Sequence, residues 1–153
     1  MSLWTFRERK EKYVIDIRVG NENLDERKAA RGMIRTNHAH IGTAFMDGLH
    51  DCRDTFNLCQ KHDIPTAIKI REGASTKPKH SPRRKREVQI YQSIPYEEWT
   101  REKNYGMRWP LTEGIYSGSK RIFGEYVSAA KKRNMYHEVK LKFWAYNQVL
   151  VGT

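Results

Sequence analysis

The stretch IGTAFMDG, residues 41–48, is a short apolar run that ends in an aspartate and a glycine. A short apolar run bounded by turn residues is typical of a buried strand. A segment with the composition of a helix lies on each side of it, LDERKAARGMIRT (24–36) and DCRDTFNLCQKHD (51–63). Beyond them, YVIDIRV (13–19) and IPTAIKI (64–70) are predicted strands. The order strand, helix, strand, helix, strand predicts an α/β domain with a central sheet.

The chain is strongly basic. Its 153 residues hold 29 Lys and Arg against 18 Asp and Glu, which gives a formal net charge of +11 and a pI near 9.8. This excess predicts a polyanionic partner, most simply nucleic acid, with an anionic membrane surface as the competing partner. A chain of this length is expected to form one domain and to bury a hydrophobic core. The sequence has neither a long apolar run nor the apolar core of a signal peptide, so we expect a cytoplasmic protein with no membrane partner.

Two cysteines, Cys52 and Cys59, are seven residues apart in the predicted helix 51–63. Two helical turns would separate them by roughly 10 Å along the axis, at a rise of about 1.5 Å per residue. That distance exceeds the reach of a disulfide. We therefore expect both thiols to be reduced.

Residues 72–87, EGASTKPKHSPRRKRE, form a basic stretch without apolar periodicity. Gly, Ser and Pro interrupt it, which predicts a loop or a mobile basic arm. A solvated linker is one interpretation, and an arm that neutralises DNA phosphates without reading sequence is the other. Its positive side chains are Lys77, Lys79, Arg83, Arg84, Lys85 and Arg86.

A further helix is predicted to begin within YGMRWPLTEGIYSGSK, residues 105–120. Pro110 suits the first turn of a helix, where its missing N–H costs nothing. We expect this helix to continue through residues 121–130. Spacings of three and four place a carboxylate, a phenol and an ammonium on one face: Glu113, Tyr116 and Lys120. On spacing alone, this face is either functional or a solvated surface with an ion pair.

The last predicted helix is NMYHEVKLKFWAYNQVL, residues 134–150. Its Trp144 and its tyrosines are interpreted as core residues rather than as platforms for stacking bases. An apolar stripe at helical spacing is formed by Val139, Phe143, Tyr146 and Leu150.

Asp47 follows a predicted buried strand and precedes Gly48, a favoured position for a functional carboxylate in an α/β sheet. A turn former or a helix cap is the alternative interpretation. Together with Glu113, Asp47 could hold a divalent metal. Mg²⁺ prefers hard oxygen ligands and usually takes one or two protein carboxylates together with phosphate and water. Two such ions would clamp the attacking and leaving oxygens of a phosphodiester.

A zinc site is the competing metal hypothesis. The candidate ligands are His38, His40, His50 and Cys52. Their spacing matches none of the usual Cys and His pairs, which favours ordinary surface or core roles for them. The sequence also has no nucleophile motif for Ser-His-Asp catalysis.

The stretches DGLHDCRDTFNLCQKHDIPTAIKIRE (47–72) and YGMRWPLTEGIYSGSKRIFGEYVSA (105–129) together resemble the C-terminal half of insertion-sequence DDE transposases. These transposases carry a Tyr-Arg-Glu-Lys signature around a catalytic glutamate. The resemblance extends from about residue 13 to residue 147. It rests on features in a fixed order, namely an Asp after a strand, a basic stretch, and then Tyr105, Arg108, Glu113 and Lys120.

The resemblance implies a ribonuclease-H-like fold, a mixed sheet flanked by helices, that acts in DNA transposition. Asp47 would be the second acidic residue of the catalytic triad and Glu113 the third, and both would hold Mg²⁺ or Mn²⁺. Arg108 and Lys120 would contact phosphates or bases of the transposon end, with Tyr105 beside them. The metal ions would support cleavage at the transposon end and transfer of the freed 3′-hydroxyl to target DNA.

The chain departs from the family pattern in three places. Four residues, rather than three, separate Arg108 from Glu113, and His50 stands where a Tyr is usual. The first catalytic Asp should lie on the strand just before residues 13–19, where the sequence reads only MSLWTFRERKEK. A strand is therefore expected to be missing there. Substitutes for the first Asp are Glu8, Glu11 and Asp16, whereas Asp25 is predicted to cap the next helix.

Three functions follow from these residues. The first is a truncated DDE transposase that binds DNA and is slow or inactive because it lacks the first acid. The second is a non-catalytic basic DNA-binding remnant. The third is a stand-alone nuclease of the same fold, completed by Glu8 or Asp16. Because a missing strand would leave a sheet edge open, we also expect self-association.

Overall fold

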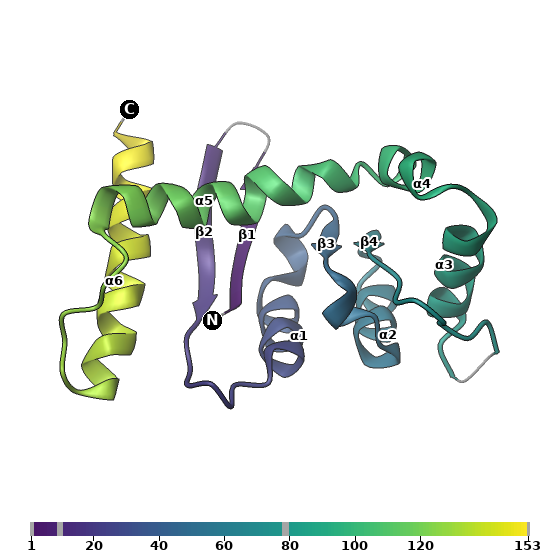
Figure 1. Cartoon of the computed structure of the whole chain (residues 1–153), viewed down its shortest axis with the longest axis horizontal. Coiled ribbons are helices and arrows are strands. Elements are labelled where there is room, and N and C mark those ends of the chain that lie inside the picture. The colour runs from purple at the N-terminus through teal and green to yellow at the C-terminus, as the bar shows by residue number, and fades with distance from the viewer. Residues whose placement is uncertain (1, 9–10, 78–79, 153) are drawn as a thin grey trace. The chain divides into compact units, whose positions relative to one another are not determined.

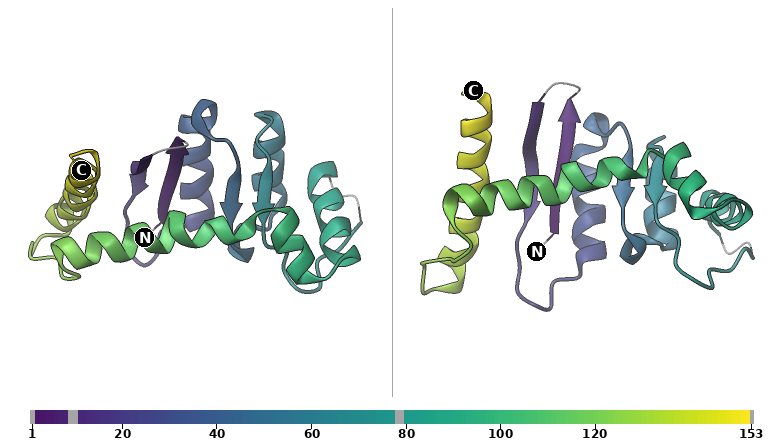
Figure 2. Two further views of the ribbon diagram at one scale, coloured as in Figure 1. Left: turned by 90° about the horizontal axis from the view of Figure 1, so that it is seen from above. Right: turned by 45° about the horizontal axis from the view of Figure 1, so that its top comes forward.

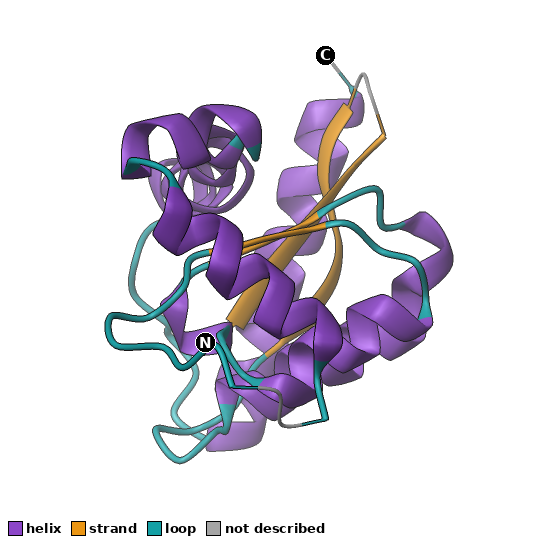
Figure 3. Cartoon of the chain, turned by 90° about the vertical axis from the view of Figure 1, so that its right-hand side faces the viewer, coloured by secondary structure: helices purple, strands orange, loops and turns teal. Residues whose placement is uncertain are grey.

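The computed structural model describes residues 2–8, 11–77 and 80–152, which form a mixed α/β structure rich in helices (Figure 3). The chain divides into two compact units. The terminal unit comprises Met1–Met33 and Trp109–Thr153, and the central unit comprises Ile34–Arg108.

The described residues form four strands and six α-helices (Figure 1). The strands are β1 (Ser2–Glu8), β2 (Glu11–Arg18), β3 (Ala44–Met46) and β4 (Thr66–Ile68). The helices are α1 (Glu26–Asn37), α2 (Arg53–Lys61), α3 (Pro82–Ser93), α4 (Tyr96–Glu102), α5 (Arg108–Phe123) and α6 (Lys132–Val151). Short 3₁₀ turns occupy His38–His40, Gly48–His50 and Tyr105–Met107.

In the terminal unit, β1 and β2 form an antiparallel pair that runs from Ser2 opposite Arg18 to Glu8 opposite Glu11. The expectation that no strand precedes residues 13–19 is therefore wrong. Residues 2–8 read SLWTFRE, and aromatic and β-branched residues of this kind favour strands even when the run is not continuously apolar. Glu8, the acid expected nearest the first catalytic position, is the last residue of β1.

The core of the terminal unit forms where α5 and α6 pack against β2. Its buried residues are Val14, Ile115, Phe143 and Tyr146, and Val139 and Leu150 pack against them. The apolar stripe predicted for the last helix is therefore confirmed. Gly118 is needed for this packing, because a Cβ at that position would lie only 2.8 Å from the Tyr146 hydroxyl.

Two details of these helices differ from the prediction. α5 ends at Phe123 rather than near residue 130, because Gly124 adopts a positive φ of 76° that stops the helix. Trp144 is 62% exposed, so its assignment to the core is wrong. Trp144 follows Phe143 directly, and one residue along an α-helix turns the side chain by about 100°, away from the buried stripe.

In the central unit, β3 and β4 pair in parallel, with Ala44 opposite Thr66 and Met46 opposite Ile68. They lie side by side in both views of Figure 2. The predicted order of strand, helix, strand, helix and strand is present as β2, α1, β3, α2 and β4. The expected single central sheet is not formed by hydrogen bonding among the described residues, since the strands join as β1 with β2 and as β3 with β4.

The basic stretch 72–87 is only partly a loop. α3 begins at Pro82, so residues 82–87 are helical and the loop prediction is wrong for them. Pro at the first helical position after Ser81 is a start signal, and Arg and Lys are good helix formers. Val88, six residues after Pro82, is fully buried and anchors the helix. Lys79 lies outside the described residues.

A second core forms around α4 in the central unit. Trp99 is 1% exposed and packs with Tyr105 and Ala67. The Trp99 ring lies 5.0 Å from the rings of both Tyr91 and Tyr105, centroid to centroid. This aromatic cluster fixes the segment that leads from α4 into the 3₁₀ turn Tyr105–Met107.

Cys52 and Cys59 are both free thiols, as predicted. Cys59 is buried in α2, whereas Cys52 is the N-cap residue of that helix and is partly exposed. Among the described residues, no helix combines the length and the apolar character needed to cross a membrane.

Candidate functional site in the central unit

Asp47 directly follows β3, as predicted. Its carboxylate Oδ1 accepts a hydrogen bond of 3.0 Å from the main-chain N–H of Leu49 and so caps the 3₁₀ turn Gly48–His50. The side chain is nevertheless 51% exposed. The cap interpretation is therefore confirmed, and the carboxylate remains accessible from solvent.

Tyr105 reaches the residue before Asp47. Its hydroxyl donates a buried hydrogen bond of 3.1 Å to the main-chain carbonyl of Met46. Burial raises the pKa of Tyr105 above its ordinary value, although the nearby Arg108 guanidinium opposes this rise. The phenol is therefore a proton donor throughout the neutral pH range. Its role here is to hold the end of β3.

Arg108 completes the group. Its Nη1 lies 3.9 Å from Asp47 Oδ2, and its guanidinium lies 5.6 Å from the centre of the Tyr105 ring. The structure thus brings together Asp47, Tyr105 and Arg108, three residues that the sequence analysis selected. They come from segments that are about 60 residues apart in the chain. We call them the Asp47 group.

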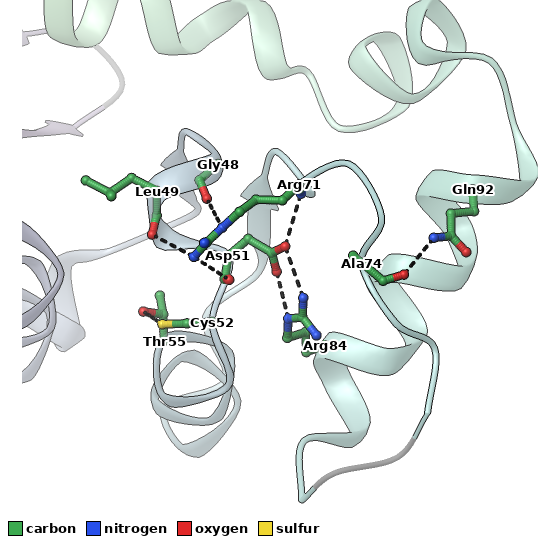
Figure 4. A network of polar contacts seen from close by, with 9 residues as sticks. All are labelled: Gly48, Leu49, Asp51, Cys52, Thr55, Arg71, Ala74, Arg84 and Gln92. Carbon is green, nitrogen blue, oxygen red and sulfur yellow. Dashed lines mark hydrogen bonds and ion pairs between the residues drawn. The ribbon is translucent and has the colours of Figure 1, made fainter.

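A buried ion pair supports the turn that follows Asp47 (Figure 4). The Asp51 side chain is 0% exposed, and its two oxygens accept hydrogen bonds of 2.7 and 3.1 Å from Nε and Nη2 of Arg84. Asp51 Oδ2 also accepts the main-chain N–H of Arg71 at 3.0 Å. Asp51 therefore ties the turn to α3, and sequence reasoning missed it because nothing in the sequence distinguishes it from a surface acid.

The Arg71 side chain closes the same turn from the other side. Its Nε donates to the carbonyl of Gly48 at 2.9 Å, and its Nη2 donates to the carbonyl of Asp51 at 3.2 Å. Figure 4 shows the guanidinium lying across these carbonyls. Arg71 and Arg84 together give the residues after Asp47 a fixed backbone.

The predicted DNA-binding residues of α3 differ in their surroundings. The Arg83 guanidinium donates to the carbonyl of Ile64 at 2.6 Å, and Arg84 holds Asp51. Both side chains therefore link α3 to neighbouring segments. Arg86 is exposed, and Lys85 is partly exposed and lines a pocket. Lys85 and Arg86 are thus the members of this set whose charges are directed toward solvent.

In the terminal unit, Glu113 lies exposed on α5. Lys120, predicted to contact phosphate, forms an ion pair of 2.6 Å with Glu125 and lies 4.6 Å from the centre of the Tyr116 ring. The hydrogen bond to Glu125 raises the pKa of Lys120, and Lys120 in turn lowers the pKa of Glu125. Tyr116 and Lys120 are therefore neighbours, as the helical spacing predicted.

The proposed zinc ligands do not gather in the structure. His38 stacks on His62, with ring centroids 4.1 Å apart, while His50 is buried after Asp47 and Cys52 contacts the Thr55 hydroxyl at 3.2 Å. Across the described ranges, no group of three or more His, Cys, Asp or Glu side chains is placed to hold a metal ion.

The substitutes considered for the first acid can be placed only in part. Asp16 pairs with Arg18, with 3.4 Å between Oδ2 and Nη2, and its side chain is 17% exposed. The side chains of Glu8 and Glu11 lie outside the described part of the chain. Asp25 accepts the N–H groups of Arg27 and Lys28 at 3.1 and 3.2 Å, so its predicted role as the cap of α1 is confirmed.

At the turn that follows β3, the half-exposed carboxylate of Asp47 is accessible to a divalent cation. Asp51 cannot serve, because its oxygens are buried on Arg84 and on the Arg71 N–H. One protein carboxylate is within the range that Mg²⁺ uses when phosphate and water complete its shell. Asp47 thus supplies a single oxygen-bearing side chain here, the smallest number that Mg²⁺ takes from a protein.

No protein-family model, no curated protein and no solved structure matches the chain.

Proposed function

We propose that the protein binds DNA and belongs with DDE transposases, cleaving phosphodiesters with the help of Mg²⁺ or Mn²⁺. The observation that carries the proposal is the Asp47 group. Three residues that the resemblance assigns to one catalytic constellation lie together in the central unit, with Arg108 Nη1 3.9 Å from the Asp47 carboxylate. Tyr105 and Arg108 are neighbours in the chain, so the informative contact is the one that joins Arg108 to Asp47, which lies in a distant segment of the sequence.

In this proposal each residue has a separate role. Asp47 and Glu113 would hold the metal, which supplies charge stabilisation for the attacking and leaving oxygens of the phosphodiester. Arg108 would bind a phosphate oxygen, since its guanidinium lies beside the half-exposed Asp47 carboxylate and over the Tyr105 ring. Tyr105 would position Asp47 through the Met46 carbonyl. The ribonuclease-H-like arrangement of the sheet is part of the same proposal.

The test is nicking of supercoiled plasmid DNA by the full chain in Mg²⁺ or Mn²⁺. Asp47→Asn and Glu113→Gln should each abolish nicking while DNA binding persists. Glu98→Gln is the matched control, because Glu98 is an exposed acid of α4 outside the proposed site. Nicking that survives both substitutions would remove the two carboxylates from catalysis.

A non-catalytic DNA-binding protein is the second candidate. It is favoured by the engagement of the Asp47 carboxylate with Leu49 N–H and Arg108, which suits a structural cap. It predicts DNA binding that weakens steeply with salt and no nicking with any metal. The stand-alone nuclease would instead lose nicking on mutation of Glu8 or Asp16.

A further inference from the structure

A pocket of about 390 Å³ opens in the central unit beside the buried Asp51–Arg84 pair. Its volume lies within the range of sites that take small ligands. The residues of its wall that matter here come from α2, from α3 and from the loop before α3: Cys52, Arg53, Lys77, Ser81, Arg84 and Lys85.

The wall of this pocket is positively charged. Four of the described residues that line it are Lys or Arg, and no described lining residue is Asp or Glu. The charge of Arg84 is neutralised by its ion pair with the buried Asp51, with 2.7 Å between Asp51 Oδ1 and Arg84 Nε. The charges of Lys77 and Lys85 remain on the pocket side, where they favour an anion.

Two helix N-termini meet at the same pocket. Cys52 is the N-cap residue of α2, which has nine residues, and Ser81 is the N-cap residue of α3, which has twelve. In α3 the first helical hydrogen bond runs from Lys85 N–H to the Ser81 carbonyl, so the N–H groups of residues 83 and 84 have no acceptor within the helix. Both helix dipoles add positive potential there.

The Ser81 hydroxyl is the independent sign of a ligand. Ser81 is 4% exposed and lines the pocket. Its Oγ is buried and has no hydrogen-bond partner among the described residues, although an N-cap serine normally caps its own helix. A buried hydroxyl without a partner is costly, and an anion in the pocket would accept its hydrogen bond.

We propose that this pocket binds a phosphate group. Ser81 Oγ and the first N–H groups of α3 donate hydrogen bonds to its oxygens, and Lys77 and Lys85 balance its charge. A phosphodiester of the DNA backbone and free inorganic phosphate offer the same chemistry. The inference stands apart from the proposed cleavage, because neither Asp47 nor Glu113 lines the pocket.

The first experiment is a titration of the full chain with inorganic phosphate, followed by the ¹H–¹⁵N NMR signals of residues 53 and 81–85. The expected result is saturable binding of one phosphate. Ser81→Ala should weaken that binding about tenfold or more, as expected for the loss of a hydrogen bond to a charged group. Ser117→Ala, at an exposed serine of α5, should leave the affinity unchanged.

A charge variant provides a second readout. Lys85→Gln should weaken phosphate binding several-fold, whereas Lys140→Gln, an equal change of charge on the exposed face of α6, should not. This comparison holds even if the Ser81 variant folds poorly. Phosphate should also raise the melting temperature of the wild-type protein at constant ionic strength, and it should raise that of the Ser81 variant by less at the same phosphate concentration.

The source of the phosphate follows from competition with a short DNA duplex at matched ionic strength. If phosphate displaces the duplex and Ser81→Ala weakens duplex binding, the pocket takes a phosphodiester of DNA. If duplex binding is unchanged while phosphate binding is lost, the ligand is a free phosphate. Either result supports the pocket.

Two results would overturn the inference. One is phosphate binding that never saturates in the wild-type protein. The other is binding with the same affinity in the wild-type, Ser81→Ala and Lys85→Gln proteins. Plasmid nicking reports separately on the proposed function, so the two proposals can fail independently.

Discussion

The hydroxyl of Tyr105 donates a hydrogen bond of 3.1 Å to the main-chain carbonyl of Met46, the residue that precedes Asp47. The bond joins a 3₁₀ turn to the end of β3 across 59 residues of sequence. The carbonyl belongs to a residue that is 2% exposed, so water cannot easily replace the phenol. Tyr105 therefore holds the backbone of the residue that precedes Asp47.

Tyr105→Phe should lower the free energy of unfolding by about 0.5–1.5 kcal/mol, because the Met46 carbonyl loses one of its two donors and keeps the Lys69 N–H at 3.1 Å. Urea unfolding monitored by circular dichroism measures this change. Tyr126→Phe is the matched control and should have no effect, since Tyr126 is 89% exposed. Equal stability of the two variants would show that the Met46 carbonyl gains nothing from Tyr105. If Asp47 is catalytic, Tyr105→Phe should also slow metal-dependent nicking.

The Asp47 group could be predicted from two features of the sequence. The Tyr-Arg-Glu-Lys signature indicated Tyr105 and Arg108, and the end of a predicted apolar strand indicated Asp47. The sequence could not predict the Asp51–Arg84 pair, since the burial of an acid depends on a partner 33 residues away that reads as one of several basic residues. The α3 helix was missed because a dense run of charge concealed the helix start at Ser81 and Pro82. β1 was missed because only a continuously apolar strand was expected there.

Arg84→Ala should destabilise the protein by about 3 kcal/mol or more, because it leaves the carboxylate of Asp51 buried without a counter-ion. Arg86→Ala, on the exposed side of the same helix, should change stability by less than about 0.5 kcal/mol. Chemical denaturation of both variants checks the difference.

A double-mutant cycle with Asp51→Ala and Arg84→Ala tests the pairing itself. Removing both partners should cost less than the sum of the two single substitutions, because neither charge is then left unpaired. Additive effects would mean that the two side chains act independently, in spite of the 2.7 Å between Asp51 Oδ1 and Arg84 Nε.

Protonation of His62 should destabilise the central unit at low pH. Desolvation and the neighbouring His38 lower the pKa of His62 below its ordinary value of 6.5. The unfolded chain therefore takes up this proton more readily than the folded chain does. The stabilising contribution of neutral His62 is fully present above pH 6.5 and is lost as the pH falls through the lower, folded-state pKa.

NMR titration of the imidazole signals measures the pKa of His62 directly. In His38→Gln the pKa of His62 should rise but stay below 6.5, because desolvation is the larger cause of the shift. His137→Gln, on exposed α6, should leave it unchanged. A His62 pKa at or above 6.5 in the wild-type protein would contradict the prediction.

The two cysteines should differ in reactivity. Burial raises the pKa of the Cys59 thiol to about 11, with Arg83 opposing the rise, so it is almost entirely protonated at pH 8. Cys52 is partly exposed at the start of α2. A thiol reagent should therefore label one cysteine per folded chain, and Cys52→Ser should remove that fast reaction. Rapid labelling of both thiols in the native protein would show that α2 opens readily.

Asn147 protects the backbone of β2 in the terminal unit. Its Oδ1 accepts the N–H of Val14 at 2.7 Å, and its Nδ2 donates to the Val14 carbonyl. The side-chain amide thus takes the place that a neighbouring strand would occupy at this point. An unpaired strand edge invites pairing with a second chain, so Asn147 opposes the self-association expected from the sequence.

Asn147→Leu should therefore expose both main-chain groups of Val14. We expect a loss of about 1–3 kcal/mol in stability, because two partly buried polar groups lose their partners. We also expect more dimer in sedimentation velocity at high protein concentration. Gln148→Leu is the control, since Gln148 is an exposed neighbour on α6 and the substitution adds the same apolar side chain. If both variants associate equally, the added leucine drives association, and the edge of β2 is not the surface that pairs.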